Sequence, residues 1–215
     1  MYFLFFLSVC LHVPLLTSQS NSNTTTTAAV TTTLKNPYEA RDHIVNPHAF
    51  AYIRNPGHSV CNNGTSSVYM LVYVHSGPGN YQRRIVIRET WASRTLFPDL
   101  RLVFMIGKSL DQNLMKAIEY ENEIYQDIVQ EDFLDSYKNL TYKGIMALKW
   151  ISIYCSQTKY ILKVDDDIVV NTFTLMNHLK YLDKHIPDRQ NTILCLLWTA
   201  MMVMRDRCER RLLSE

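Results

Sequence analysis

The sequence carries almost no net charge, because its 22 lysines and arginines are nearly balanced by 20 aspartates and glutamates. It therefore gives no electrostatic argument for a nucleic-acid partner. Its five cysteines include no C-x-x-C pair, so their spacing does not indicate a zinc site. A G-x-x-x-x-G-K-[ST] loop is also lacking, which argues against the P-loop type of phosphotransferase, and there is no internal repeat.

The N-terminus has an apolar run at residues 2–16, interrupted only by Ser8, His12 and Pro14. A membrane-spanning helix needs about 17–25 residues. No lysine or arginine precedes the run to specify an orientation. We expect residues 1–16 to be a signal peptide or a short transmembrane signal-anchor, and either one directs the chain into the secretory pathway. The sequence leaves open which of the two it is.

A tract rich in threonine, serine and asparagine follows at residues 17–33, where Val30 is the one apolar residue larger than alanine. Such a tract buries too little apolar surface to offset the entropy lost on ordering. We expect residues 17–67 to be a Ser/Thr-rich stem. Sequons at Asn23, Asn63 and Asn139 suit a lumenal glycoprotein. The pairing of the cysteines outside the apolar run stays open; these are Cys61, Cys155, Cys195 and Cys208.

From residue 68 onward, strand-like and helix-like segments alternate. Runs rich in valine, isoleucine and tyrosine indicate strands, and the segments between them have apolar residues near helical spacing. This alternation predicts an α/β fold with a mainly parallel sheet and crossover helices. We expect strands at 68–76, 101–107, 160–164 and 191–203, and helices at 81–91, 113–130, 140–155 and 172–185.

Three aspartates, Asp165, Asp166 and Asp167, directly follow the predicted strand 160–164. Adjacent carboxylates disfavour one another's ionisation, so three in a row need compensating positive charge. Ligands of parallel sheets bind beyond the carboxyl ends of strands, and aspartate oxygens suit Mg²⁺ or Mn²⁺ bound to a diphosphate. Alternate residues of an extended segment point the same way, so Asp165 and Asp167 could share one cation. The alternative is an Asp-rich turn that caps a helix starting near Thr172.

Four blocks of the sequence, in family order, resemble the β-1,3-glycosyltransferases, the galactosyl- and N-acetylglucosaminyltransferases of the Golgi. They are RRIVIRETWAS (83–93), LVFMIG (102–107), ENEIYQDIVQEDFLDSYKNLTYKGIMALKW (121–150) and YILKVDDDIVVN (160–171). The resemblance covers residues 68–206. It implies a nucleotide-sugar glycosyltransferase A-type fold, which is Rossmann-like, with a mainly parallel sheet and helices on both faces. The apolar N-terminus and the threonine-rich stem match the family's anchor-and-stem layout.

The resemblance also implies roles for single residues. Asp165 and Asp167 would bind manganese, and Asp165 and Asp166 would lie towards the ribose and sugar of a UDP-sugar donor. Basic side chains would neutralise diphosphate charge that one divalent cation does not cover. The expected donor-binding residues are Arg84, Arg88, Asp132, Lys143, Asp165 and Asp166, and the same block contains Tyr137, Asn139 and Thr141. For the arginines, a solvated helix face paired to Glu89 is the alternative. A glycan on Asn139 would lie near the donor cleft, so we expect glycosylation at Asn23 and Asn63 instead.

In this family an acceptor hydroxyl attacks the anomeric carbon of the donor, and the configuration inverts to give a β-1,3 bond. The reaction needs a carboxylate base and a Lewis acid at the departing UDP. The resemblance therefore implies a manganese-dependent hexosyltransferase that moves galactose or N-acetylglucosamine onto glycoprotein or glycolipid glycans. It also implies a single-pass type II protein of the Golgi membrane with its catalytic part in the lumen, or a secreted protein if the N-terminus is cleaved.

The resemblance places a Glu-Asp pair that supplies the base, and a Tyr/Gly-rich acceptor segment, in a part of the family's domain that follows these blocks. That part is not found in this sequence, and residues 207–215 depart from the family pattern. We therefore expect a partial glycosyltransferase domain at 68–206, incomplete at its C-terminus, that keeps the metal end of the donor site, has no catalytic base and transfers sugar poorly if at all. Two alternatives stay open: a non-catalytic, UDP-binding lumenal partner or decoy of a full-length glycosyltransferase, and a metal-dependent phosphotransferase.

Overall fold

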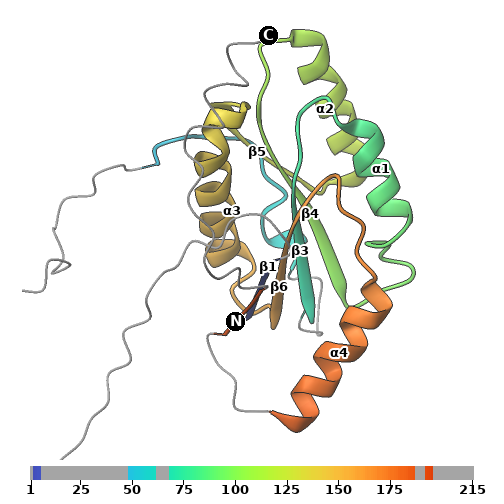
Figure 1. The fold of residues 1–215 in the computed structure, drawn as a ribbon. Coiled ribbons are helices and arrows are strands. Elements are labelled where there is room, and N and C mark those ends of the chain that lie inside the picture. The colour runs from blue at the N-terminus through green and yellow to red at the C-terminus, as the bar shows by residue number, and fades with distance from the viewer. Residues whose placement is uncertain (1, 6–47, 62–67, 187–191, 196–215) are drawn as a thin grey trace, which may run out of the picture. The chain divides into compact units, whose positions relative to one another are not determined.

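The computed structural model describes residues 2–5, 48–61, 68–186 and 192–195. Its strands form one sheet (Figure 1). The order of the strands in the sheet is β2-β5-β4-β3-β6-β1-β7. All neighbours are parallel except β2 and β5. The predicted α/β fold with a mainly parallel sheet is therefore confirmed. The strands are β1 (Tyr2–Phe5), β2 (Tyr52–Arg54), β3 (Met70–His75), β4 (Leu100–Lys108), β5 (Ile128–Leu134), β6 (Tyr160–Asp165) and β7 (Ile193–Cys195).

Helices cover both faces of the sheet, as expected (Figure 1). The helices are α1 (Tyr81–Glu89), α2 (Gln112–Tyr125), α3 (Leu140–Tyr154) and α4 (Thr172–His185), with short 3₁₀ turns η1 (Gly57–Ser59) and η2 (Tyr137–Asn139). Side chains alternate along β3, so Val72 packs with α1, α2 and α4 while Tyr73 packs with α3. Because both faces are covered, the central strands are apolar throughout rather than alternating with polar residues.

The helix expected at 113–130 is too long, because α2 ends at Tyr125 and a separate strand, β5, begins at Ile128. Gln126 has φ 51°, the left-handed conformation that ends helices. Ile128 and Val129 are completely buried against β4, where their β-branched side chains fit a pleated surface. A helical interpretation of this segment was wrong because tertiary burial, rather than local spacing, decides its conformation.

Part of the segment expected as stem belongs to the sheet domain. β2 pairs with β5, and Val60 packs against the core under α3. A disulfide joins Cys61 to Cys155, next to the end of α3. The described domain thus begins before residue 68.

At the N-terminus, β1 lies between β6 and β7 in the sheet. The rest of the expected anchor and most of the expected stem lie outside the described residues, as do Asn23, Asn63 and Cys208. Across the ranges that the structure describes, no helix is both long enough and apolar enough to cross a membrane.

Candidate functional site

The candidate site lies at the sheet edge where β3 and β6 end. These strands are parallel neighbours, and His75 is paired in register with Asp165 at their carboxyl ends. The backbone continues the pairing one step further, since the Asp166 N–H donates to the His75 carbonyl at 3.2 Å. Beyond β3 comes the loop Ser76–Asn80, which leads directly into α1. The end of β6, which carries the three aspartates, therefore lies beside this loop.

Asp166 is held by that loop and by α1. One carboxylate oxygen, Oδ2, accepts hydrogen bonds from Ser76 Oγ at 2.8 Å and Asn80 Nδ2 at 2.7 Å. The other, Oδ1, accepts from Arg83 Nη1 at 2.8 Å. Burial alone would raise the pKa of Asp166, but the hydrogen bonds from Asn80, Arg83 and Ser76 outweigh it and hold the pKa below its usual range. The ionised carboxylate of Asp166 thus links the end of β6 to α1, and its side chain is only 8% exposed.

The other two aspartates differ from Asp166 and from each other. Asp165 forms an ion pair with Lys163 at 2.6 Å and is 37% exposed. Asp167 is exposed and forms no hydrogen bond or ion pair within the part of the chain that the structure describes. β6 ends at Asp165 and the next two residues form a turn, so the strand alternation expected to align Asp165 with Asp167 does not extend to Asp167. Of the three carboxylates, that of Asp167 is the most available to a ligand.

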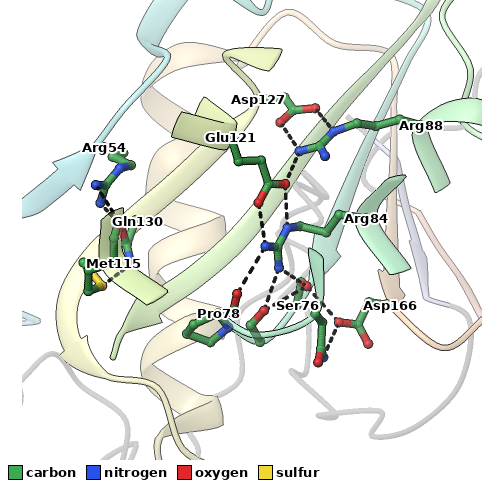
Figure 2. Close-up of polar contacts among 12 residues, drawn as sticks. Arg54, Ser76, Pro78, Arg84, Arg88, Met115, Glu121, Asp127, Gln130 and Asp166 are labelled. Atoms are coloured by element: carbon green, nitrogen blue, oxygen red, sulfur yellow. Dashed lines mark hydrogen bonds and ion pairs between the residues drawn. The ribbon is translucent and has the colours of Figure 1, made fainter. Parts of the chain in front are cut away.

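Arg84 lies inside the domain, completely buried, with every N–H donor engaged (Figure 2). Nε and Nη2 donate to the two carboxylate oxygens of Glu121 at 2.8 and 2.6 Å. The remaining donors reach Ser76 Oγ and the carbonyl oxygens of Gly77 and Pro78. Arg84 therefore fixes the Ser76–Asn80 loop, and a direct contact with a nucleotide, which stays a prediction, would require it to give up one of these bonds.

Arg88 belongs to the same buried network (Figure 2). It donates to both oxygens of Asp127 at 2.8 Å and pairs with Glu121 at 2.7 Å. Its guanidinium also lies over the Tyr125 ring, 4.0 Å from the centroid. Burial would lower the pKa of Arg88, but the hydrogen bonds to Asp127 and Glu121 raise it above its usual value. The alternative of a solvated helix face paired to Glu89 is wrong, because these partners come from α2 and the residues that follow it.

Lys143 reaches the same loop from α3. Its Nζ donates to the Ser76 carbonyl at 2.7 Å and to the Asp135 carboxylate at 2.9 Å, and Asp135 accepts from the Gly107 N–H at 2.7 Å. β4 and β5 approach so closely here that a Cβ on Gly107 would lie 2.7 Å from the Phe133 ring. Lys143 and Asp135 thus connect α3, β4 and the end of β5 to the backbone of Ser76, which in turn contacts Asp166.

Asp132 lies apart from this group. It is exposed, and its Oδ1 accepts from the Ala51 N–H at 3.0 Å, beside β2. Asn139 donates to the Leu134 carbonyl at 2.8 Å, whereas Tyr137 and Thr141 are exposed. The structure therefore brings Arg84, Lys143 and the three aspartates to one sheet edge, and it does not bring Asp132 there.

His75 is a further side chain of this edge that the sequence did not single out. Its Nε2 is buried without a hydrogen-bond partner within the described ranges. Burial, and then the positive charges of Lys163 and Lys143, lower the pKa of His75 to about 3. The imidazole is therefore neutral at physiological pH and adds no positive charge beside the aspartates.

Comparison with known proteins gives a match to a family model described as galactosyltransferase, over residues 82–215. The chain belongs to this family. It is 34% identical over 187 residues to mouse "Beta-1,3-galactosyltransferase 2", covering 81% of this chain and 43% of that protein. It is 36% identical over 141 residues to human "Beta-1,3-galactosyltransferase 1", covering 65% of this chain and 42% of that protein. The expected β-1,3-glycosyltransferase family is confirmed, and the chain spans less than half the length of these relatives.

Three of the family-like blocks converge on one residue, Ser76. Arg84 comes from the first block, Lys143 from the third and Asp166 from the fourth, and each bonds to Ser76. Sequence reasoning missed Ser76 and the buried acids Glu121 and Asp135. The one signal for the acids was that both lie in the family-like block 121–150, of which Glu121 is the first residue.

The available carboxylates fit a cation that arrives with a phosphate-bearing substrate. Among the described residues, no group of three or more His, Cys, Asp or Glu side chains could by itself hold a metal ion. Magnesium-like ions usually take one or two carboxylates, several waters and the phosphates of the substrate. Asp167 is one such carboxylate, whereas Asp165 is ion-paired to Lys163 and Asp166 already accepts three hydrogen bonds. The donor set suits shared coordination and does not form a complete metal cage.

Proposed function

We propose that this chain carries the donor-binding part of a galactosyltransferase-family enzyme. The reaction would be metal-dependent, inverting transfer of galactose or N-acetylglucosamine from a UDP-sugar to a glycan acceptor, with a β-1,3 bond as product. The observation that carries the proposal is the open carboxylate of Asp167, beyond a parallel strand and beside a loop tied down by Arg84 and Lys143. A fixed loop next to an available carboxylate is what a charged, oriented donor requires.

In this proposal Asp165 and Asp167 hold the divalent cation. Carboxylate and phosphate oxygens suit Mg²⁺ or Mn²⁺, and the family resemblance favours Mn²⁺. The bound cation would supply positive charge to the departing UDP. Lys163, which now pairs with Asp165, would share that carboxylate with the cation. The roles of Arg84 and Lys143 are to hold the Ser76–Asn80 loop in place. We assign no general base among the described residues.

The proposed location is the Golgi lumen, with the N-terminal segment as signal-anchor or cleaved signal peptide. Either role would require residues 2–5 to leave the sheet, where they pair with β6 and β7 as β1. The Cys61–Cys155 disulfide supports an oxidising compartment, because disulfides persist in the secretory pathway and are rare in the cytosol. Protein and lipid glycans of that compartment would be the acceptors.

The proposal is tested by incubating the full chain with UDP-galactose or UDP-N-acetylglucosamine, Mn²⁺ and acceptors ending in galactose or N-acetylglucosamine. Manganese-dependent binding of UDP is expected, and acceptor-dependent release of UDP with a β-1,3-linked product by NMR is expected only at a low rate, because no general base is assigned among the described residues. Both should be lost in Asp167→Ala. Release of free phosphate would contradict the proposal and favour a phosphotransferase. Manganese-dependent UDP binding without any product would favour a non-catalytic UDP-binding partner or decoy.

A further inference from the structure

Arg84 and Arg88, the arginines expected to bind the donor, are bound to other residues of the domain. Another side chain must therefore supply positive charge to the diphosphate. Every N–H of Arg84 donates within the domain. Arg88 is bound to Asp127 and Glu121 with its side chain 8% exposed, and its Nη1, which has no partner among the described residues, is buried. Lys143 is likewise buried between Ser76 and Asp135. A diphosphate carries more negative charge than one divalent cation neutralises, so a positive side chain with free donors is needed at the site.

Resting on the donor site proposed above, we propose that Arg83 is the side chain that binds the diphosphate of the donor. Arg83 lies in the first turn of α1, and its side chain is 53% exposed. Only Nη1 donates a hydrogen bond within the described chain, to Asp166 at 2.8 Å. Nε and Nη2 are free there, and together they form the fork that suits phosphate oxygens.

Asp166 positions this arginine. The carboxylate is itself fixed by Ser76 and Asn80, so it holds the Arg83 guanidinium against the sheet edge instead of leaving it to sample many rotamers. The same guanidinium lies within electrostatic reach of Asp167, which helps to raise its pKa after the hydrogen bond to Asp166 and the Asp166 charge. A phosphate that shares a cation with Asp167 would therefore arrive beside the free face of Arg83. In this account Asp166 acts on the donor through Arg83 and does not touch the metal.

The test compares UDP with uridine, which lacks the phosphates, on the full chain with Mn²⁺. UDP is titrated by calorimetry and uridine by NMR chemical shifts, with wild type, Arg83→Gln and Arg83→Lys. The matched control is Arg94→Gln, which removes the same charge from an exposed residue beyond α1. Loss of charge-assisted hydrogen bonds should weaken UDP binding by roughly 10- to 100-fold in Arg83→Gln, less in Arg83→Lys and not at all in the control. Uridine binding should be unchanged in all variants.

Two results would overturn the assignment of Arg83 while leaving the donor site intact. One is wild-type affinity for UDP in Arg83→Gln, and the other is equal weakening of UDP and uridine, which would show that the substitution merely disturbs the loop. Absence of manganese-dependent UDP binding by the wild-type chain would instead overturn the donor site, and this inference with it.

Discussion

Arg84 and Glu121 form a two-pronged ion pair inside the domain, with N–O distances of 2.8 and 2.6 Å. Their side chains are 1% and 2% exposed, so neither charge can be solvated by water if the other is removed. The pair connects α1 to α2, and through the remaining donors of Arg84 it holds the loop that carries Ser76. The geometry of the candidate donor site thus depends on Glu121, which is far from Ser76 and Asp166 in sequence.

Replacement of Glu121 by alanine should reduce the free energy of unfolding by about 3–5 kcal/mol, because it leaves Arg84 buried and uncompensated. Urea denaturation followed by circular dichroism measures this change. Glu119→Ala is the matched control, since Glu119 is 64% exposed and lies 3.9 Å from Arg54. That substitution should change stability by less than about 1 kcal/mol. Equal effects of the two would contradict the structural role of the Arg84–Glu121 pair.

Gly107 should not tolerate alanine. The added Cβ would lie 2.7 Å from the Phe133 ring and 2.9 Å from the Phe133 carbonyl oxygen, and the latter is backbone that cannot move aside. A loss of about 1–3 kcal/mol is expected from this overpacking. Gly144→Ala, in the middle of α3 where nothing lies within 4 Å of the new Cβ, should instead stabilise by about 0.5–1 kcal/mol. Thermal unfolding of both variants, with opposite shifts expected, is the measurement.

The disulfide should contribute a large part of the domain's stability. It closes a loop of 94 residues, for which the chain-entropy model gives about 4–5 kcal/mol. Denaturation with and without a reductant should show this loss in the wild-type chain. The double variant Cys61→Ala/Cys155→Ala should be less stable from the outset and insensitive to the reductant. A transition midpoint in the wild type that does not respond to the reductant would contradict the bond or its importance.

His75 should make the chain less stable in mild acid. Its pKa is about 3 in the folded state and 6.5 ordinarily, so between these values the unfolded state binds more protons. The stability due to the neutral imidazole is full above pH 6.5 and falls with decreasing pH, by up to about 1.4 kcal/mol per unit. His75→Leu should flatten the slope of unfolding free energy between pH 7 and 5, and His178→Gln, an exposed histidine on α4, should not. If the unfolding free energy of His75→Leu changed with pH as steeply as that of the wild type, the burial of a neutral imidazole would be refuted.

Much of this fold follows from local sequence pattern. The helix expected at 172–185 matches α4, and strand 160–164 differs from β6 by one residue. Placement of the aspartates beyond a parallel strand was also predictable, because the apolar run ends where the carboxylates begin. These features depend on spacing within a few residues, which a sequence displays directly.

The partners of the charged residues were not predictable in the same way. Glu89 is the acid next to Arg88 in sequence, yet Arg88 binds Asp127 and Glu121, which the fold brings to it. Likewise, Cys61 and Cys155 meet only because β2 joins the sheet and brings Cys61 close to the end of α3. Arg84 was expected to approach the nucleotide, and its burial depends on the same long-range packing. Interactions across 30 residues or more require the assembled sheet.

Our main expectation is that the sheet edge at Asp165–Asp167 binds a nucleoside diphosphate together with a divalent cation. Calorimetric titration of UDP into the full chain, with Mn²⁺ and again with a chelator, tests it most directly, beside Asp167→Asn and the exposed control Asp99→Asn. Binding of UDP should require Mn²⁺, disappear in Asp167→Asn and persist in Asp99→Asn. UDP binding that is equally strong with chelator, or equally strong in Asp167→Asn, would contradict it.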